Sequence, residues 1–127
     1  MSVPVRIAIA RAYDDRAGAD RGRWVLVDRL WPRGVSKVAA PWDEWCKDVA
    51  PSAELRRWFG HDVGRYESFA RRYRVELGLP QGARAVTHLR SLASREPLTL
   101  VTATRDVEHS GAEVLRRVLV ELTEAGA

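Results

Sequence analysis

Two short apolar runs, residues 24–27 and 98–103, are separated by a long segment in which apolar residues recur at helical spacing. Continuous apolar runs of this length are typical of strands that are covered on both faces. A strand that returns through a helical connection runs parallel to its predecessor as a rule. This order of elements constrains the fold most, because it predicts a parallel strand pair with helices packed against it.

The flanking segments add further elements. Residues 3–9 alternate apolar with smaller or polar side chains, which predicts another strand with one buried face. Residues 42–50 are expected to form a short helix that ends at Pro51. Ser52 stands where an N-cap belongs and Gly60 where a helix closes, so a second helix is predicted between them.

Three more helices follow from apolar stripes within residues 66–77, 86–93 and 112–122. We therefore predict one α/β domain over residues 1–127, with a small, at least partly parallel sheet of about three or four strands and helices packed on its faces. The direction of the first strand stays open, because no helical pattern joins it to the second.

The positive net charge suggests a nucleic-acid partner, but the distribution of the charges along the chain weakens that hypothesis. The formal net charge is +4, and 19 of the 21 basic residues are Arg. The 17 acidic residues are mixed among them, which is typical of a solvated surface. On the predicted helix 66–77 and just before it, Arg65 and Arg72 fall on one side and Arg71 and Arg74 on the other, so they form no single basic stripe.

Several classes of protein are disfavoured. The single cysteine, Cys46, allows no internal disulfide and no cysteine-based zinc site. No two histidines have the spacing of a helical metal pair, so we expect neither a metal nor another cofactor. The N-terminus does not resemble a signal peptide, and no stretch reaches the ~20 apolar residues of a membrane span. We expect a cytoplasmic protein without membrane contacts.

The strongest functional signal lies in two loops that the parallel pair would bring side by side. One follows the run 24–27, and the other follows the run 98–103 and leads into the last helix. Ligands of open α/β sheets bind beyond the carboxyl ends of the strands. The residues concerned are Asp28, Arg29, Trp31, Arg33, Arg105, Asp106, His109 and Ser110.

Arginine dominates this set. Converging guanidinium groups offer paired donors that match the oxygens of phosphate or carboxylate. A helix N-terminus near Ser110 would add free N–H groups. We therefore expect Arg29, Arg33 and Arg105, together with Trp31 and Ser110, to bind a small anionic ligand.

Asp28 and His109 are the candidates for a catalytic role, because either side chain can carry a proton at such a site. A structural role stays open beside it. Asp28 would then pair with a neighbouring arginine and cap backbone groups, and Trp31 would fill the core. The sequence does not decide whether the protein is an enzyme, and it names no reaction.

The segment Val27–Gly34 resembles the signature of the YeaO-like family, a bacterial and archaeal family catalogued as domain of unknown function 488. The likeness covers nearly the whole chain, and the resemblance implies a compact α/β domain with no agreed activity, substrate or cofactor. The positions that match the family pattern include Asp28, Arg29, Trp31, Pro32, Arg33, Ser52, Arg56, His61 and His109.

The resemblance adds His61 and Arg56 to the candidate site, with Asp106 as a further secondary candidate. Two positions depart from the pattern of many relatives: Thr102 replaces Tyr, and Ser110 replaces Asn. If those positions contact the ligand, this protein binds a different ligand from its relatives, or binds the same one less well.

Three functions compete at this stage: a small-molecule site for an anion, a nucleic-acid-binding module, and a non-enzymatic interaction or oligomerisation domain. The third is motivated by five tryptophans in a short chain. We favour the first, because irregular loops at strand ends carry function more often than regular elements do. The oligomeric state is not predicted.

Overall fold

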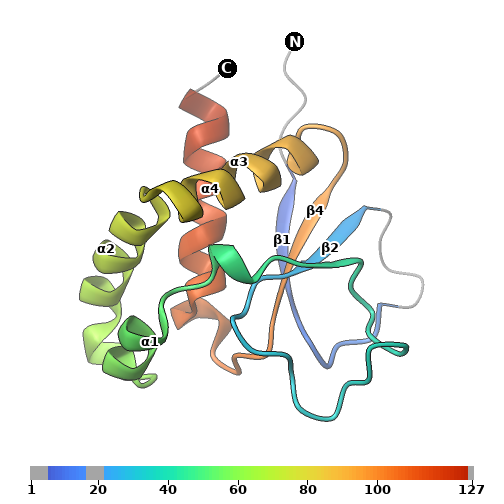
Figure 1. Cartoon of the computed structure of the whole chain (residues 1–127), viewed down its shortest axis with the longest axis horizontal. Coiled ribbons are helices and arrows are strands. Elements are labelled where there is room, and N and C mark those ends of the chain that lie inside the picture. Colours follow the sequence, from blue (N-terminus) through green and yellow to red (C-terminus); the bar gives the residue numbers. More distant parts are fainter. Residues whose placement is uncertain (1–5, 17–21, 126–127) are drawn as a thin grey trace.

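The computed structural model describes residues 6–16 and 22–125 (Figure 1). The strands are β1 (Ile7–Arg11), β2 (Arg23–Leu26), β3 (Glu44–Trp45) and β4 (Leu98–Thr102). The α-helices are α1 (Ala53–Phe59), α2 (Tyr66–Leu77), α3 (Pro80–Ala93) and α4 (Gly111–Ala125). Single turns of 3-10 helix are η1 (Lys47–Val49), η2 (Val63–Arg65) and η3 (Val107–His109).

The strands form one sheet in the order β1-β4-β2-β3, and every neighbouring pair is parallel. Leu100 at the centre of β4 lies in register with Ile9 on one side and Val25 on the other. The α/β class and the parallel pairing of β2 with β4 are confirmed. The first strand, whose direction was left open, is parallel as well, although Val3 and Val5 lie outside the described residues.

The prediction of a short helix that begins at Trp42 is wrong. Glu44 and Trp45 form the edge strand β3, and only the single turn η1 follows before Pro51. The reason is pairing with a distant strand: the N–H of Asp43 donates to the carbonyl of Trp24 and the N–H of Cys46 to that of Leu26, both at 2.8 Å. A local helical pattern cannot reveal such partners.

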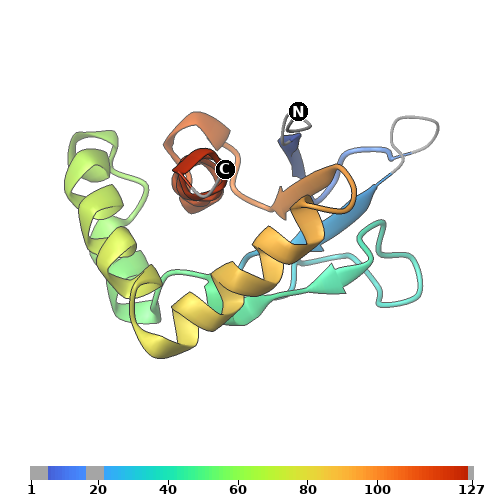
Figure 2. The same cartoon turned by 90° about the horizontal axis from the view of Figure 1, so that it is seen from above.

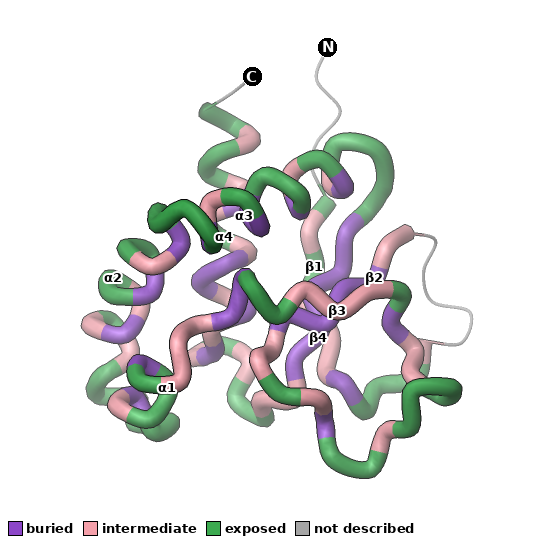
Figure 3. Tube along the Cα trace, in the orientation of Figure 1, coloured by how far each residue is buried: buried purple, intermediate pink, exposed green. Residues whose placement is uncertain are grey.

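The helices cover one face of the sheet, as the view from above shows (Figure 2). Their buried side chains form one core with Val25, Val27, Leu98 and Leu100 of the sheet. Along the tube in Figure 3 the two central strands, β2 and β4, and the inner sides of the helices are largely buried. We expected helices on more than one face, but no described helix reaches the second face.

The second face is covered instead by the loop between β2 and β3. Trp24, Leu26 and Val101 of the sheet pack there against Trp42. Around them lie the partly buried side chains of Trp31, Val35 and Ala40. Aromatic rings bury large areas per residue, so a loop with two tryptophans is able to replace a helical layer. This arrangement holds the loop 28–43 in place at the end of the sheet.

The predicted caps of α1 are confirmed. The Ser52 hydroxyl accepts a hydrogen bond from the N–H of Leu55 at 3.1 Å, and Gly60 closes the helix in the left-handed conformation. Ser52 also donates its hydroxyl and its backbone N–H to the carboxylate of Glu76, at 2.6 and 2.8 Å. The carboxylate therefore ties the start of α1 to α2.

Candidate functional site

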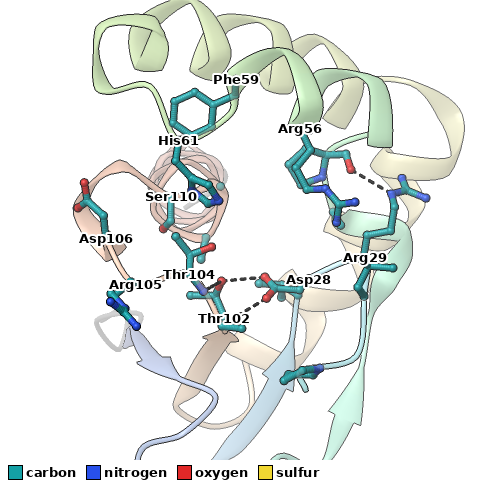
Figure 4. Close-up of a pocket in the computed structure, with 18 of the residues that line it drawn as sticks. Asp28, Arg29, Arg56, Phe59, His61, Thr102, Thr104, Arg105, Asp106 and Ser110 are labelled. Carbon is teal, nitrogen blue, oxygen red and sulfur yellow. Dashed lines mark hydrogen bonds between the residues drawn. The ribbon is translucent and has the colours of Figure 1, made fainter. Parts of the chain in front are cut away.

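A pocket of about 620 Å³ lies beyond the carboxyl ends of β1, β2 and β4 (Figure 4). Its walls come from the segments that follow these strands, from α1 and from the start of α4. Because all the strands are parallel, their ends meet at one edge, which is where ligands of such sheets bind. The two loops singled out in the sequence lie side by side at this edge.

Internal contacts hold the loop after β2. Trp31 donates its indole N–H to the carbonyl of Val35 at 2.5 Å, and its ring packs edge-on against Trp42 and Trp45, with centroids 4.9 and 5.4 Å apart. Gly34 adopts a φ of +80°, a conformation open to glycine. Trp31 thus lines the pocket and also belongs to the core of the second face.

Asp28 joins the ends of β2 and β4. Its carboxylate accepts the Thr102 hydroxyl at 2.7 Å and the N–H of Ala103 at 2.8 Å. Its backbone carbonyl accepts the indole N–H of Trp45 at 2.8 Å. Burial raises the pKa of Asp28, although these hydrogen bonds and the positive charge of Arg56 oppose the rise. Both carboxylate oxygens are engaged, so this arrangement is that of a structural clamp.

Four arginines line the pocket: Arg29, Arg33, Arg56 and Arg105. Arg29 is anchored through its Nε, which donates to the carbonyl of Pro51 at 3.1 Å. Within residues 6–16 and 22–125, the guanidinium groups of the other three have no hydrogen-bond or ion-pair partner. The pocket therefore holds more positive charge than its own side chains neutralise.

The start of α4 forms the opposite wall. Ser110 caps this helix: its hydroxyl accepts the N–H of Glu113 at 3.2 Å and donates to the carbonyl of Val107 at 2.7 Å. Gly111 and Ala112 line the pocket, and their N–H groups have no acceptor in the described part of the chain. These donors and the helix dipole favour negative charge at this end of the pocket.

His61 follows α1 and its C-cap Gly60, and it lines the pocket. It has a φ of +58° and is the one residue other than glycine with a positive φ in the described segments. Figure 4 shows its imidazole pointing into the pocket, towards the strand end that carries Thr102 and Thr104. The ring centroid lies 6.2 Å from that of Phe59.

His109 is the predicted residue that the pocket does not include. Its Nδ1 lies 2.8 Å from the carboxylate of Asp106, and its ring packs edge-on against Tyr66 at 5.1 Å. The turn η3 holds it there, so the two catalytic candidates, Asp28 and His109, do not meet. Asp106 lines the pocket but shares its carboxylate with His109.

Most of the predicted set does come together: Asp28, Arg29, Trp31, Arg33, Arg56, His61, Arg105, Asp106 and Ser110 all line the pocket. Sequence reasoning missed Tyr13, Phe59, Phe69 and Thr104. The two phenylalanines lie on apolar helical stripes, where a pocket wall and a core position give the same pattern. Tyr13 follows β1, and nothing in the sequence indicated that β1 pairs with β4.

Thr102 and Ser110, the two departures from the family pattern, also line the pocket. Their hydroxyls donate hydrogen bonds within the protein, to Asp28 and to the carbonyl of Val107.

The described residues give little support for a metal site, a reactive cysteine or a membrane-spanning helix. No group of three or more His, Cys, Asp or Glu side chains in that part of the chain is placed to hold a metal ion. Burial raises the pKa of the Cys46 thiol to about 11, which keeps it protonated and unreactive at neutral pH. None of the described helices has the length and apolar character needed to cross a membrane.

Fold and site together define a small α/β protein with an arginine-lined pocket at the carboxyl edge of a parallel sheet. The chain belongs to the family described as the inactive DUF488-N3 subclade, whose model matches residues 6–127.

Two relatives illustrate the likeness. The uncharacterised protein Rv3073c of Mycobacterium tuberculosis is 46% identical over 114 residues, which cover 90% of this chain and 93% of that protein. The uncharacterised protein YeaO of Escherichia coli is 38% identical over 111 residues, 87% of this chain and 94% of that protein. The resemblance to the YeaO-like family is therefore confirmed. No solved structure matches the chain significantly.

Proposed function

We propose that the protein binds a small ligand bearing a phosphate or carboxylate group in the pocket at the carboxyl edge of its sheet. The observation that carries this proposal is the set of four arginines around one pocket of about 620 Å³. Three of their guanidinium groups have no partner within the described residues. Guanidinium groups bind planar and tetrahedral oxyanions through paired hydrogen bonds.

A binding role accounts for the site better than a catalytic one. Asp28 has both carboxylate oxygens engaged, and His109 lies outside the pocket against Tyr66. General acid–base catalysis needs a side chain within reach of the reacting proton. The description of the matching subclade as inactive supports the same reading.

The alternatives are less well supported. On the helical surface Arg65 and Arg72 lie over the ring of Trp58, at 5.3 and 4.1 Å from its centroid, and Arg74 pairs with Glu121 at 2.8 Å. These internal contacts weigh against a free basic surface for nucleic acid. Each of the five tryptophans is buried or half-buried, which weakens the motive for an interaction domain.

The test is calorimetric or NMR titration with inorganic phosphate, acetate and pyrophosphate on the wild type, Arg56→Ala and Arg57→Ala. Arg57 is the matched control, because it is the exposed neighbour of Arg56 on α1 and does not line the pocket. We expect Arg56→Ala to weaken anion binding at least fivefold and Arg57→Ala to leave it unchanged. Equal binding by both variants, or no binding by the wild type, would refute the proposal.

A further inference from the structure

The pocket offers more than a bare inorganic anion would use. Its volume of about 620 Å³ lies in the range of sites for small organic molecules. Several aromatic side chains line it: Tyr13, Trp31, Phe59, His61 and Phe69. Such walls are typical of sites that bury most of an organic ligand's surface.

We infer that the anionic group of the ligand is carried on a flat aromatic ring, with the anion at Arg29 and Arg56 and the ring packed against the imidazole of His61, beside Phe59. This inference rests on the proposed anion-binding function and names the class of ligand for the same pocket.

The first support is the backbone at His61. An L-residue in the left-handed conformation is strained, and such strain persists where the surrounding structure requires it, often at binding sites. Here the strained turn after Gly60 directs an exposed imidazole into the pocket (Figure 4). The ring has no hydrogen-bond partner within residues 6–16 and 22–125, so both its face and its nitrogens are free for a ligand.

The second support is the aromatic wall beside it. Phe59 stacks on Phe69 with centroids 4.4 Å apart and an interplanar angle of 18°. Both phenylalanines are buried in the core and still line the pocket. At the mouth, Tyr13 and Leu30 are 53% and 60% exposed. A ring that entered here would bury apolar surface on several sides.

The third support is the position of the charge. Arg56 and Phe59 are three residues apart on α1 and therefore lie on the same side of that helix. Figure 4 shows Arg29 beside Arg56 on this wall, while Arg105 lies across the pocket. One short helix thus presents a cation and an aromatic ring to the same ligand, and His61 extends the aromatic part.

The experiment compares four probes by NMR-monitored titration of the folded full chain: inorganic phosphate, phenyl phosphate, benzoate and cyclohexanecarboxylate. The last two have the same charge and similar size, and only benzoate is flat. We expect phenyl phosphate to bind about tenfold more tightly than phosphate, and benzoate about fivefold more tightly than cyclohexanecarboxylate, as aromatic contacts provide.

The variants separate the ring from the charge. His61→Ala is expected to remove most of the advantage of phenyl phosphate over phosphate, whereas Arg56→Ala weakens every probe and Arg57→Ala none. His61→Gly relaxes the backbone and should lose the same preference for phenyl phosphate over phosphate. Its thermal stability should be undiminished, so misfolding is excluded as the cause of that loss.

Two failures are distinguishable. If phosphate binds through Arg56 but the ring adds nothing, or cyclohexanecarboxylate equals benzoate, the aromatic inference is overturned and the anion site remains. If none of the four probes binds, the proposed function itself is overturned.

Discussion

Replacing Ser52 with Ala tests how the pocket wall formed by α1 is anchored. The hydroxyl makes two contacts in the structure: it accepts the N–H of Leu55 at 3.1 Å and donates to Glu76 at 2.6 Å. Loss of an N-cap costs about 1 kcal/mol, and loss of a hydrogen bond to a charged group costs roughly 1.5–3 kcal/mol. Glu76 keeps the N–H of residue 52 at 2.8 Å, so its charge is not left wholly unpaired.

We therefore expect Ser52→Ala to lower the free energy of unfolding by about 2–3 kcal/mol, a large part of the 5–15 kcal/mol typical of a domain. Urea denaturation followed by tryptophan fluorescence measures this loss, with an unchanged m-value. Ser52→Thr keeps a hydroxyl and is the matched control, expected to lose less than about 1 kcal/mol.

A double-mutant cycle with Glu76→Gln isolates the link between the two helices. The two single losses should exceed the loss in the double variant by at least about 0.5 kcal/mol, because both remove the same contact. A loss for Ser52→Ala below about 0.5 kcal/mol, or strict additivity with Glu76→Gln, would refute the reasoning.

Three further outcomes follow from the structure. Tyr73→Phe leaves the carbonyl of Val49 without its buried donor and should cost about 1–3 kcal/mol in thermal or urea unfolding; a neutral variant would contradict the contact. Because burial raises the pKa of Asp28 above its ordinary value of 3.8, ionising this carboxyl lowers the free energy of unfolding as the pH rises above 3.8. Asp28→Asn should therefore flatten that part of the curve of unfolding free energy against pH. An unchanged slope in the variant would contradict the raised pKa. His61→Gly relieves the left-handed backbone at φ 58° and should stabilise the protein by about 1 kcal/mol; a lower melting temperature would argue that the conformation is unstrained.

The parallel pair and the adjoining loops were predictable because their signals are local. The runs 24–27 and 98–103 are short and continuously apolar, and a crossover between them determines their relative direction. Once they are parallel, Arg29 and Arg105 must follow the same edge of the sheet. Capping is equally local, which is why Ser52 and Gly60 marked the ends of α1 correctly.

Other features depend on contacts that sequence spacing does not reveal. The strand Glu44–Trp45 is only a two-residue pairing with β2, and the run from Trp42 to Trp45 suggested the start of a helix. The second face of the sheet is covered by a loop, because Trp31 and Trp42 supply the apolar area that a helix would have provided. His109 follows β4 closely in sequence, yet the turn η3 and the ring of Tyr66 hold it away from the pocket.

The most direct test of the account is an amide chemical-shift titration of the isotopically labelled protein with inorganic phosphate. We expect saturable shifts at the backbone N–H of Arg29 and at the side chains of Arg29 and Arg56, with none on α3. Perturbations confined to α3 or to the far end of the sheet, or no saturable shift at all, would contradict an anion site at the carboxyl edge.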